Sequence, residues 1–330
     1  MTQTGIVAPP ATKRAPTPTD LLAARAFVAA HYPRTPLYRA PFLSREHGGE
    51  LWVKYENQGP IRSFKARGAL YRLSLLDAAE RKRGVVTAST GNHGQGIAFA
   101  GGLLDVPTVI VVPADSPRIK TDNIQFLGGE LRVAGHSLSD AEHEARAIAA
   151  REGRIHIEDG DDAGLMAGAG TVAWEILDQL PDADAIIVQV GGGNLISGVA
   201  QVAKRLRPDI RIIGVQSEAA PAVYRSWQSK RMVEAPCTTF AGGLATSHPG
   251  ALAFSVLKDI VDTMLLVSEA DLREGIVTAL RTTGQVVEGA GAASFAALKP
   301  LAKDLPGSKT VLILTGGNLP IEDLRALLAS

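Results

Sequence analysis

The sequence predicts an α/β protein whose sheet is mostly parallel and covered by helices on both faces. Short β-branched runs alternate with longer amphipathic runs, which is the pattern of a parallel sheet. Glycine-rich turns follow three of the predicted strands, at 89–96, 191–198 and 315–318. With 330 residues, of which 45% are hydrophobic, the chain is long enough for two domains.

Eight strands are expected, separated by helical runs such as DAEHEARAIAARE and SGVAQVAKRL. Ligands of such sheets bind beyond the carboxyl ends of the strands, at a topological switch point. In chain order the strands are LWVKYE (51–56), GVVTAS (84–89), TVIVVP (108–113), RIHIED (154–159), AIIVQV (185–190), RIIGVQ (211–216), TMLLVS (263–268) and TVLILT (310–315).

Composition excludes several classes of protein. Thirty-four basic residues balance 34 acidic ones without a basic block, so neither nucleic acid nor a membrane surface is an expected partner. The uncharged stretch 185–203 carries GGGN in its middle, which favours strand–turn–helix over a membrane span.

A single cysteine, Cys237, fits a reducing cytoplasm. Residues 1–18 are rich in Pro and Thr, lack a signal-peptide core and are predicted to form a flexible tail.

The turn GGGNLISG (191–198) is a candidate phosphate site. It follows one predicted strand and opens a helical run, so its backbone N–H groups and the helix dipole favour an anion. It matches neither the GxGxxG pattern nor a Walker loop. The alternative is a tight turn that binds nothing.

The turn STGNHGQG (89–96) suits a carboxylate, because its hydroxyl groups, amide and N–H groups stand at a helix start. Asn92 could reach a ring hydroxyl. His93 has no second metal ligand at a suitable spacing, which favours a structural role in the turn.

Lys65 lies in GPIRSFKARGAL and is the candidate nucleophile. A lysine forms a Schiff base with an aldehyde. Together with a phosphate turn and the polar strand end LTGGN (314–318), it indicates pyridoxal phosphate (PLP), an electron sink.

Several acidic residues need an interpretation. Glu288, in EGAGAAS, either lines a site or caps a helix, and the sequence favours neither. A further acidic cluster resembles a metal site but is expected to cap the following helix and to meet solvent; it comprises Glu158, Asp159, Asp161 and Asp162.

Taken together, these motifs resemble the fold-type II PLP enzymes (tryptophan synthase β-like), and most of all the branch of serine/threonine dehydratases (threonine ammonia-lyases) and serine racemases. The resemblance covers about residues 35–330. The matching runs, in order, are SFKARGA, STGNHGQGIA, GGGNLISG, GAGT (168–171), GGLATSHPGALAF (242–254), EGAGAAS (288–294) and LTGGN.

The resemblance implies two doubly wound domains with PLP in the cleft between them. Residues 19–83 and 161–330 would form the large PLP-binding domain and 84–160 the small domain. Members of the family are commonly homodimers. The chain ends soon after LTGGN, so no appended regulatory domain is expected.

The resemblance also implies the role of each site residue. Lys65 would hold PLP and act as the catalytic base at Cα, with Phe64 packed near the ring. Asn92 would bond the ring hydroxyl and Thr315 would face the pyridine nitrogen. The phosphate donors would be Gly191, Gly192, Gly193, Asn194 and Leu195. The substrate carboxylate would be held by Ser89, Thr90, Gly91 and His93.

The implied reaction is dehydration and deamination of a β-hydroxy amino acid, with threonine or serine expected first, to a 2-oxo acid and ammonia. The alternatives are a serine or hydroxyaspartate racemase and a β-replacement synthase. A non-catalytic PLP carrier is disfavoured, because a binder needs neither Lys65 nor Thr315.

This chain departs from the family at four places. Ile61 and Arg62 replace small residues, so Arg62 could bind a distal substrate carboxylate, point to solvent or brace the backbone. Thr90 replaces the serine of the racemases, which makes racemisation the second choice. The run Ala241-Gly242-Gly243 lacks the family's carboxylate. Members of the family that bind a metal carry acidic residues at three further positions. These positions are Gln216, Ala220 and Ala222 here, so no metal site is expected.

Overall fold

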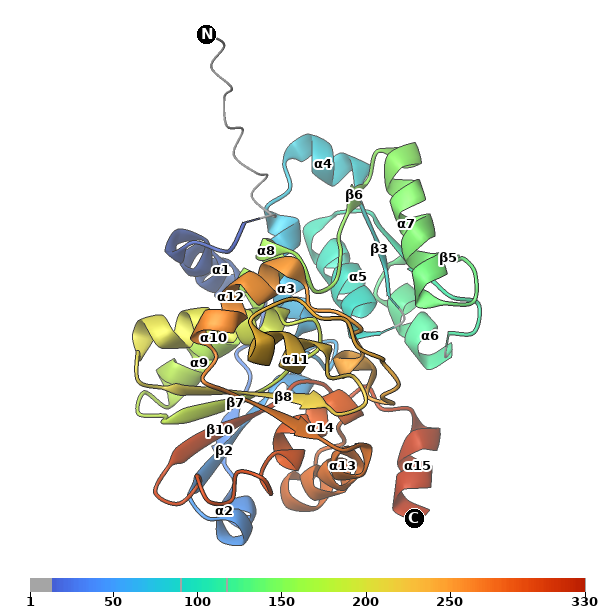
Figure 1. Ribbon diagram of the computed structural model, residues 1–330. Helices are drawn as coiled ribbons and strands as arrows, with labels where there is room; N and C mark the ends of the chain where they lie inside the picture. The colour runs from blue at the N-terminus through green and yellow to red at the C-terminus, as the bar shows by residue number, and fades with distance from the viewer. Residues whose placement is uncertain (1–13, 90, 117, 330) are drawn as a thin grey trace.

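The computed structural model describes residues 14–329 except residues 90 and 117, and contains two sheets (Figure 1). The larger sheet has six strands in the order β1-β2-β10-β7-β8-β9. Only β1 runs antiparallel to its neighbour. Because β10 lies between β2 and β7, strand ends that are far apart in sequence meet at one edge. The strands are β1 (Leu37–Arg39), β2 (Glu50–Tyr55), β7 (Ala185–Gln189), β8 (Arg211–Ser217), β9 (Thr263–Val267) and β10 (Lys309–Leu314).

The smaller sheet is entirely parallel, in the order β5-β4-β3-β6. It lies with its helices above the larger sheet in the view of Figure 1. Its elements are α4 (Ala78–Arg83), β3 (Val85–Ala88), α5 (Asn92–Leu104), β4 (Thr108–Val112), α6 (Arg118–Phe126), β5 (Glu130–Val133), α7 (Leu138–Glu152) and β6 (Ile155–His156).

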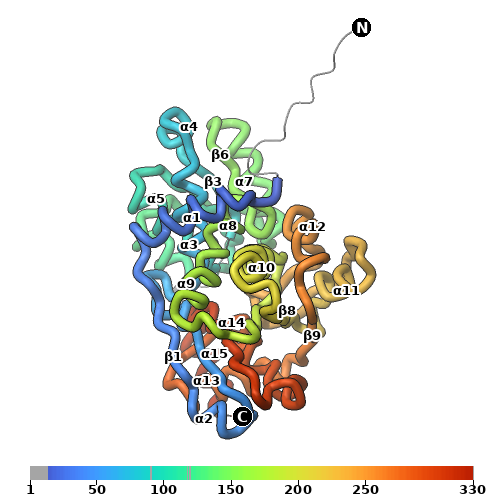
Figure 2. Tube along the Cα trace, turned by 90° about the vertical axis from the view of Figure 1, so that its left-hand side faces the viewer, coloured from blue at the N-terminus to red at the C-terminus, as the bar shows by residue number. Residues whose placement is uncertain are grey.

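Helices cover both faces of the larger sheet, because successive side chains of a strand point to opposite faces. Ile186 and Val188 of β7 pack with α1, α9 and α10, whereas Ile187 packs with α2, α13 and α14. Figure 2 shows α1, α8, α9 and α10 grouped on the first of these faces. The helices are α1 (Pro18–His31), α2 (Pro41–His47), α3 (Lys65–Ser74), α8 (Ala163–Ala169), α9 (Thr171–Gln179), α10 (Asn194–Leu206), α11 (Ala222–Ser229), α12 (Ala251–Ile260), α13 (Glu269–Thr283), α14 (Gly289–Ala296) and α15 (Ile321–Ala329), with 3₁₀ turns η2 (Glu56–Gln58) and η3 (Gly242–Leu244).

All eight expected strands are present, and the sequence missed two. β6 is shorter than expected, with two residues. The missed strands are β1, which has three residues, and β5, whose residues are half-buried or exposed. Both lie at the edge of a sheet, so neither requires the apolar run by which a central strand is identified.

Helix α3 joins the two sheets, since it packs against both α5 and α8. A Cβ on Gly168 of α8 would lie 2.4 Å from the carbonyl oxygen of Arg67, so only glycine allows the backbones to approach this closely. The Arg67 side chain is fully buried, and its Nε and Nη1 donate to Glu56 and Glu175, each over 2.7 Å. Lys54 Nζ also contacts Glu175, over 2.6 Å. This buried ionic network fixes the first turns of α3.

No helix among the described residues is long and apolar enough to cross a membrane. Cys237 is a free, exposed cysteine.

Candidate active site

The turn that carries Lys65 is joined to the end of β10. The Phe64 N–H donates to the Thr315 carbonyl over 3.1 Å, and Ser63 forms an isolated β-bridge with Gly316. Lys65 is the first residue of α3, and Thr315 is buried directly after β10. The tertiary fold therefore brings the lysine motif and LTGGN side by side.

The Lys65 ammonium contacts a carboxylate that the sequence did not assign to the site. Nζ lies 2.5 Å from Asp159 Oδ1 and 5.6 Å from the centroid of the Phe64 ring. Burial raises the pKa of Asp159, but the charges of Lys65 and His93 and the hydrogen bonds from Lys65 and the Gly160 N–H together hold that pKa at about 2. Asp159 is therefore an ionised partner of the candidate nucleophile.

The expectation for the acidic cluster was correct only in part. Asp162 caps α8, accepting from the N–H groups of Gly164 and Leu165, and it also binds Arg72 over 2.7 Å. Glu158 is exposed. Asp159 and Asp161, however, have specific protein partners, because the folded chain places cations and N–H groups beside them. No three His, Cys, Asp or Glu side chains of the described residues are grouped to hold a metal ion.

His93 is buried and faces the same carboxylate. Its Nε2 lies 3.0 Å from Thr87 Oγ1, and its Nδ1 lies 3.6 Å from Asp159 Oδ1. Burial lowers the pKa of His93, which favours the neutral ring. The ring is therefore fixed by Thr87 and presented to the surroundings of Lys65.

Asn92 and Glu288 are in direct contact. Asn92 Nδ2 donates to Glu288 Oε1 over 2.5 Å, and Asn318 Nδ2 donates to Asn92 Oδ1 over 2.7 Å. Glu288 occupies the N-cap position of α14, but its side chain makes no capping bond. Burial raises the pKa of Glu288, against the opposing effect of the Asn92 bond. The sequence allowed Glu288 either to line a site or to cap a helix, and its contacts agree with a position in the site.

The turn after β7 is shaped for a polar ligand. Gly193 has a φ of 109°, and a Cβ on Gly191 would lie 2.5 Å from the carbonyl oxygen of Gly243. Both polar atoms of the Asn194 side chain are buried without a hydrogen-bond partner. Buried amides are normally satisfied, so this side chain indicates a bound polar group. Leu195 follows on the first turn of α10 and is also buried.

A cavity of about 20 Å³ connects Lys65 with Asn194. It has room for about one water. It is lined by Phe64, Lys65, Gly68, His93, Asp159, Leu165, Ala169 and Asn194. The predicted nucleophile, phosphate turn and carboxylate turn thus converge on one place.

The carboxylate turn is only partly described, because Thr90 lies outside the described residues. Ser89 is buried, and its Oγ accepts from the Gly91 N–H over 3.2 Å. A Cβ on Gly91 would meet no atom within 4 Å, so this backbone borders open space.

Arg62 does not line the cavity. Its side chain is exposed, and no hydrogen bond or ion pair joins its guanidinium to another described residue. Its φ of 55° is unusual for a residue other than glycine, and its carbonyl accepts from the Gly317 N–H over 2.9 Å. The backbone of Arg62 thus braces the site, and its side chain is free to reach solvent or substrate.

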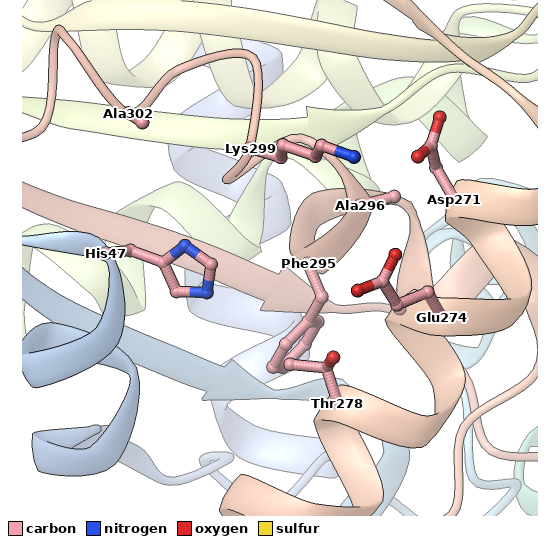
Figure 3. Close-up of a pocket in the computed structure, with 9 residues that line it drawn as sticks. His47, Asp271, Glu274, Thr278, Phe295, Ala296, Lys299 and Ala302 are labelled. Atoms are coloured by element: carbon pink, nitrogen blue, oxygen red, sulfur yellow. The ribbon is translucent and has the colours of Figure 1, made fainter.

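A second cavity lies elsewhere. It measures about 210 Å³ and lies between α2, α13 and α14, on the opposite face of the larger sheet from α3 (Figure 3). Its wall includes His47, Asp271, Glu274 and Lys299. None of the predicted site residues lines it.

The residues around Lys65 fit pyridoxal phosphate. An aldehyde needs an amine, a phosphate needs N–H donors and an aromatic ring needs an apolar surface. Lys65, the turn at Asn194 and Phe64 offer these three features around one cavity. The donor set itself, above all the unpartnered Asn194 amide, is the evidence for this fit.

Comparison with known proteins agrees with a site for pyridoxal phosphate. The family model described as "Pyridoxal-phosphate dependent enzyme" matches residues 28–316. The chain is 38% identical to L-threonine ammonia-lyase of Thermotoga maritima over 87% of this chain and 72% of that protein. It is 37% identical to L-threo-3-hydroxyaspartate ammonia-lyase of a Pseudomonas species, over 89% and 93%.

Among solved structures, maize serine racemase superposes with a TM-score of 0.89 at 29% identity, covering 94% of this chain and 96% of that one. A family match over most of the chain, together with a lysine, an aromatic ring and a glycine turn around one cavity, leads to one conclusion. This chain belongs to the family of pyridoxal-phosphate dependent enzymes, in its fold-type II branch.

Proposed function

We propose that this enzyme removes water and ammonia from a β-hydroxy amino acid, threonine or serine first among them, and yields a 2-oxo acid. The observation that carries the proposal is the cavity shared by the Lys65 amine and the glycine turn at Asn194. The similarity to ammonia-lyases of threonine and 3-hydroxyaspartate supports this reaction type.

PLP, when bound, supplies an aldehyde for an amine and an electron sink for negative charge at Cα. Lys65 then removes the Cα proton with its Nζ and holds it. That work requires a lysine that is neutral for part of the cycle, which a desolvated site favours. Phe64, whose ring centroid lies 5.6 Å from Nζ, would offer an apolar surface to the cofactor ring and exclude water from one side.

The polar residues orient the bound groups. The N–H groups of the turn hold the phosphate; we assign Gly191, Gly192, Gly193, Asn194 and Leu195 to this role. An amide nitrogen carries two hydrogens, so Asn92 can donate one to Glu288 and the other to the ring hydroxyl. Thr315 offers a neutral hydroxyl to the pyridine nitrogen, which does not favour ring protonation and so suits elimination.

The substrate carboxylate is assigned to the turn at the start of α5. Exposed N–H groups at a helix start favour an anion. The assigned residues are Ser89, Thr90, Gly91 and His93. A substrate held there by its carboxylate would present its Cα toward Lys65, because His93 and Lys65 line the same cavity.

Catalysis in this scheme needs a movement of the chain. A cavity of about 20 Å³ cannot admit a pyridine ring. We assign residues 84–160, which hold the smaller sheet, to a small domain that opens and closes against residues 19–83 and 161–330. Closure excludes water and sets orientation. A homodimer and a cytoplasmic location complete the proposal. Of the tail predicted at 1–18, residues 1–13 lie outside the described residues. The prediction was wrong at its end, because Thr17 caps α1 and Pro18 begins that helix.

The experiment is release of 2-oxo acid and ammonia from the L and D forms of threonine, serine, 3-hydroxyaspartate and phenylserine. Release from at least one is expected. A PLP-loaded protein that releases neither product from any of them would contradict the proposal. Interconversion of L- and D-serine would then point to racemisation, which the similarity to maize serine racemase makes the second candidate.

A further inference from the structure

Asp159 stands out because its carboxylate accepts from the Gly160 N–H of its own loop and also contacts the candidate nucleophile. The neighbouring Asp161 accepts from the Leu252 N–H over 2.6 Å, and Asp162 caps α8. Both anchor the loop that joins β6 to α8. The side chain of Asp159 instead contacts Lys65 and His93. Its place is therefore fixed by its neighbours, and its own carboxylate is directed at the candidate nucleophile.

The loop also touches the phosphate turn. Gly160 has a φ of 95°, and a Cβ on Gly192 would lie 3.5 Å from Gly160 Cα. A Cβ on Gly250 would lie 2.2 Å from the Gly160 carbonyl oxygen. Asp159 is thus held between Lys65 and the turn that is assigned to the phosphate.

We propose that Asp159 forms an ion pair with the protonated Lys65 side chain when that lysine is not bonded to the cofactor. This applies to the cofactor-free protein and to the part of the cycle after the displaced Lys65 has taken the Cα proton. The inference rests on the proposed function only for its second part. Asp159 acts through Lys65 and is therefore a positioning residue.

The charges around the pair support this assignment. Lys65 from α3 and His93 from α5 face Asp159, and burial favours the neutral form of His93. Asn194, which lines the same cavity from α10, carries no charge. The ammonium of Lys65 is accordingly the cation that balances Asp159. Both side chains keep some contact with water, at 25% and 40% exposure, so the pair can open.

Loading of the cofactor requires the pair to open. The unprotonated Nζ attacks the aldehyde carbon, the C=N bond forms, and the aldehyde oxygen leaves as one water. Before this step the ammonium must release a proton to solvent. Nζ must also leave its contact with Asp159 Oδ1, at 2.5 Å, before it can reach the aldehyde. During turnover the displaced Lys65 takes the Cα proton as a neutral amine, and Asp159 then holds the resulting ammonium within the site.

The experiment follows the absorbance band that appears when PLP is added to cofactor-stripped protein, between pH 6 and pH 10. Asp159→Asn is expected to load about tenfold faster than wild type near neutral pH. The difference should narrow toward the alkaline end, because an amine without its proton no longer pairs with Asp159. Asp159→Glu should retain the slow loading. In turnover Asp159→Asn should lower kcat with little change in KM.

Glu158→Gln is the matched control. It removes a carboxylate from the same loop, but Glu158 contacts Arg146, over 3.5 Å, and not Lys65. Its loading rate should equal that of wild type. The inference is overturned if folded Asp159→Asn loads at the wild-type rate at every pH, or if Glu158→Gln loads equally fast. Loading is measured without substrate, so failure of the ammonia-lyase assay and failure of the loading assay are separate results.

Discussion

Asn92 donates a hydrogen bond of 2.5 Å to Glu288, although the two residues are 196 positions apart in the chain. The contact joins the start of α5, beside the smaller sheet, to the start of α14, beside the larger one. Asn318 fixes the orientation of the Asn92 amide by donating to its oxygen. A carboxylate and an amide from the two sheets thus meet in the candidate site.

Glu288→Gln is expected to stabilise the cofactor-free protein at neutral pH, by on the order of 1 kcal/mol. Burial raises the pKa of Glu288 in the folded state. The carboxyl of Glu288 therefore has a higher pKa in the folded state than in the unfolded state. Its contribution to folding stability is fully present below the pKa of the unfolded state and is lost as the pH rises through the pKa of the folded state. The glutamine has no charge to bury, so thermal unfolding from pH 4 to pH 8 should show a smaller decline. An unchanged pH profile would contradict this account.

Asn194→Ala is expected to stabilise the cofactor-free protein while weakening PLP binding. Both polar atoms of this buried amide lack a partner. Each unsatisfied buried group costs about 1–3 kcal/mol. Thermal melts with and without PLP measure both effects, and the stabilisation by added PLP should shrink. Gln201→Ala is the control, because it removes another buried amide of α10 whose Nε2 contacts Met166 and which does not line the cavity. It should leave the stabilisation by PLP unchanged.

Arg62→Asn tests whether the exposed guanidinium contacts substrate. Asparagine tolerates the left-handed φ of 55°, so the backbone of the site is retained. If Arg62 binds a distal carboxylate, kcat/KM should fall about tenfold or more for 3-hydroxyaspartate and remain nearly unchanged for threonine. Arg62→Lys should keep part of the preference. Equal losses on the two substrates would show that the side chain does not bind substrate.

Arg67→Leu should destabilise the protein strongly, by about 3–5 kcal/mol, because it removes the buried cation that pairs with Glu56 and leaves Glu175 with Lys54 alone. The loss is measured by denaturant unfolding of the cofactor-free protein. Arg281→Leu removes an exposed pair with Glu46 and should have a much smaller effect. Similar losses for the two variants would mean that the buried network does not secure α3.

The sequence by itself determined the eight main strands and the place of each glycine turn at a strand end. These features are local, since periodicity, β-branching and turn chemistry act over a few residues. It also predicted the lysine, the cofactor and the family, because seven motifs occur in order. It missed β1 and β5, where a short or half-exposed edge strand carries little apolar signal.

Only the tertiary structure decided which side chains meet. Asp159 lies 94 residues from Lys65 and was expected to cap a helix and to meet solvent; it is exposed, but it contacts the Lys65 ammonium and not a helix end. The structure also brought Glu288 to Asn92, and buried the Arg67 cation between two carboxylates. The physical reason is that α3 packs between the two sheets and draws distant loops to one place. Such contacts depend on packing, which no local pattern records.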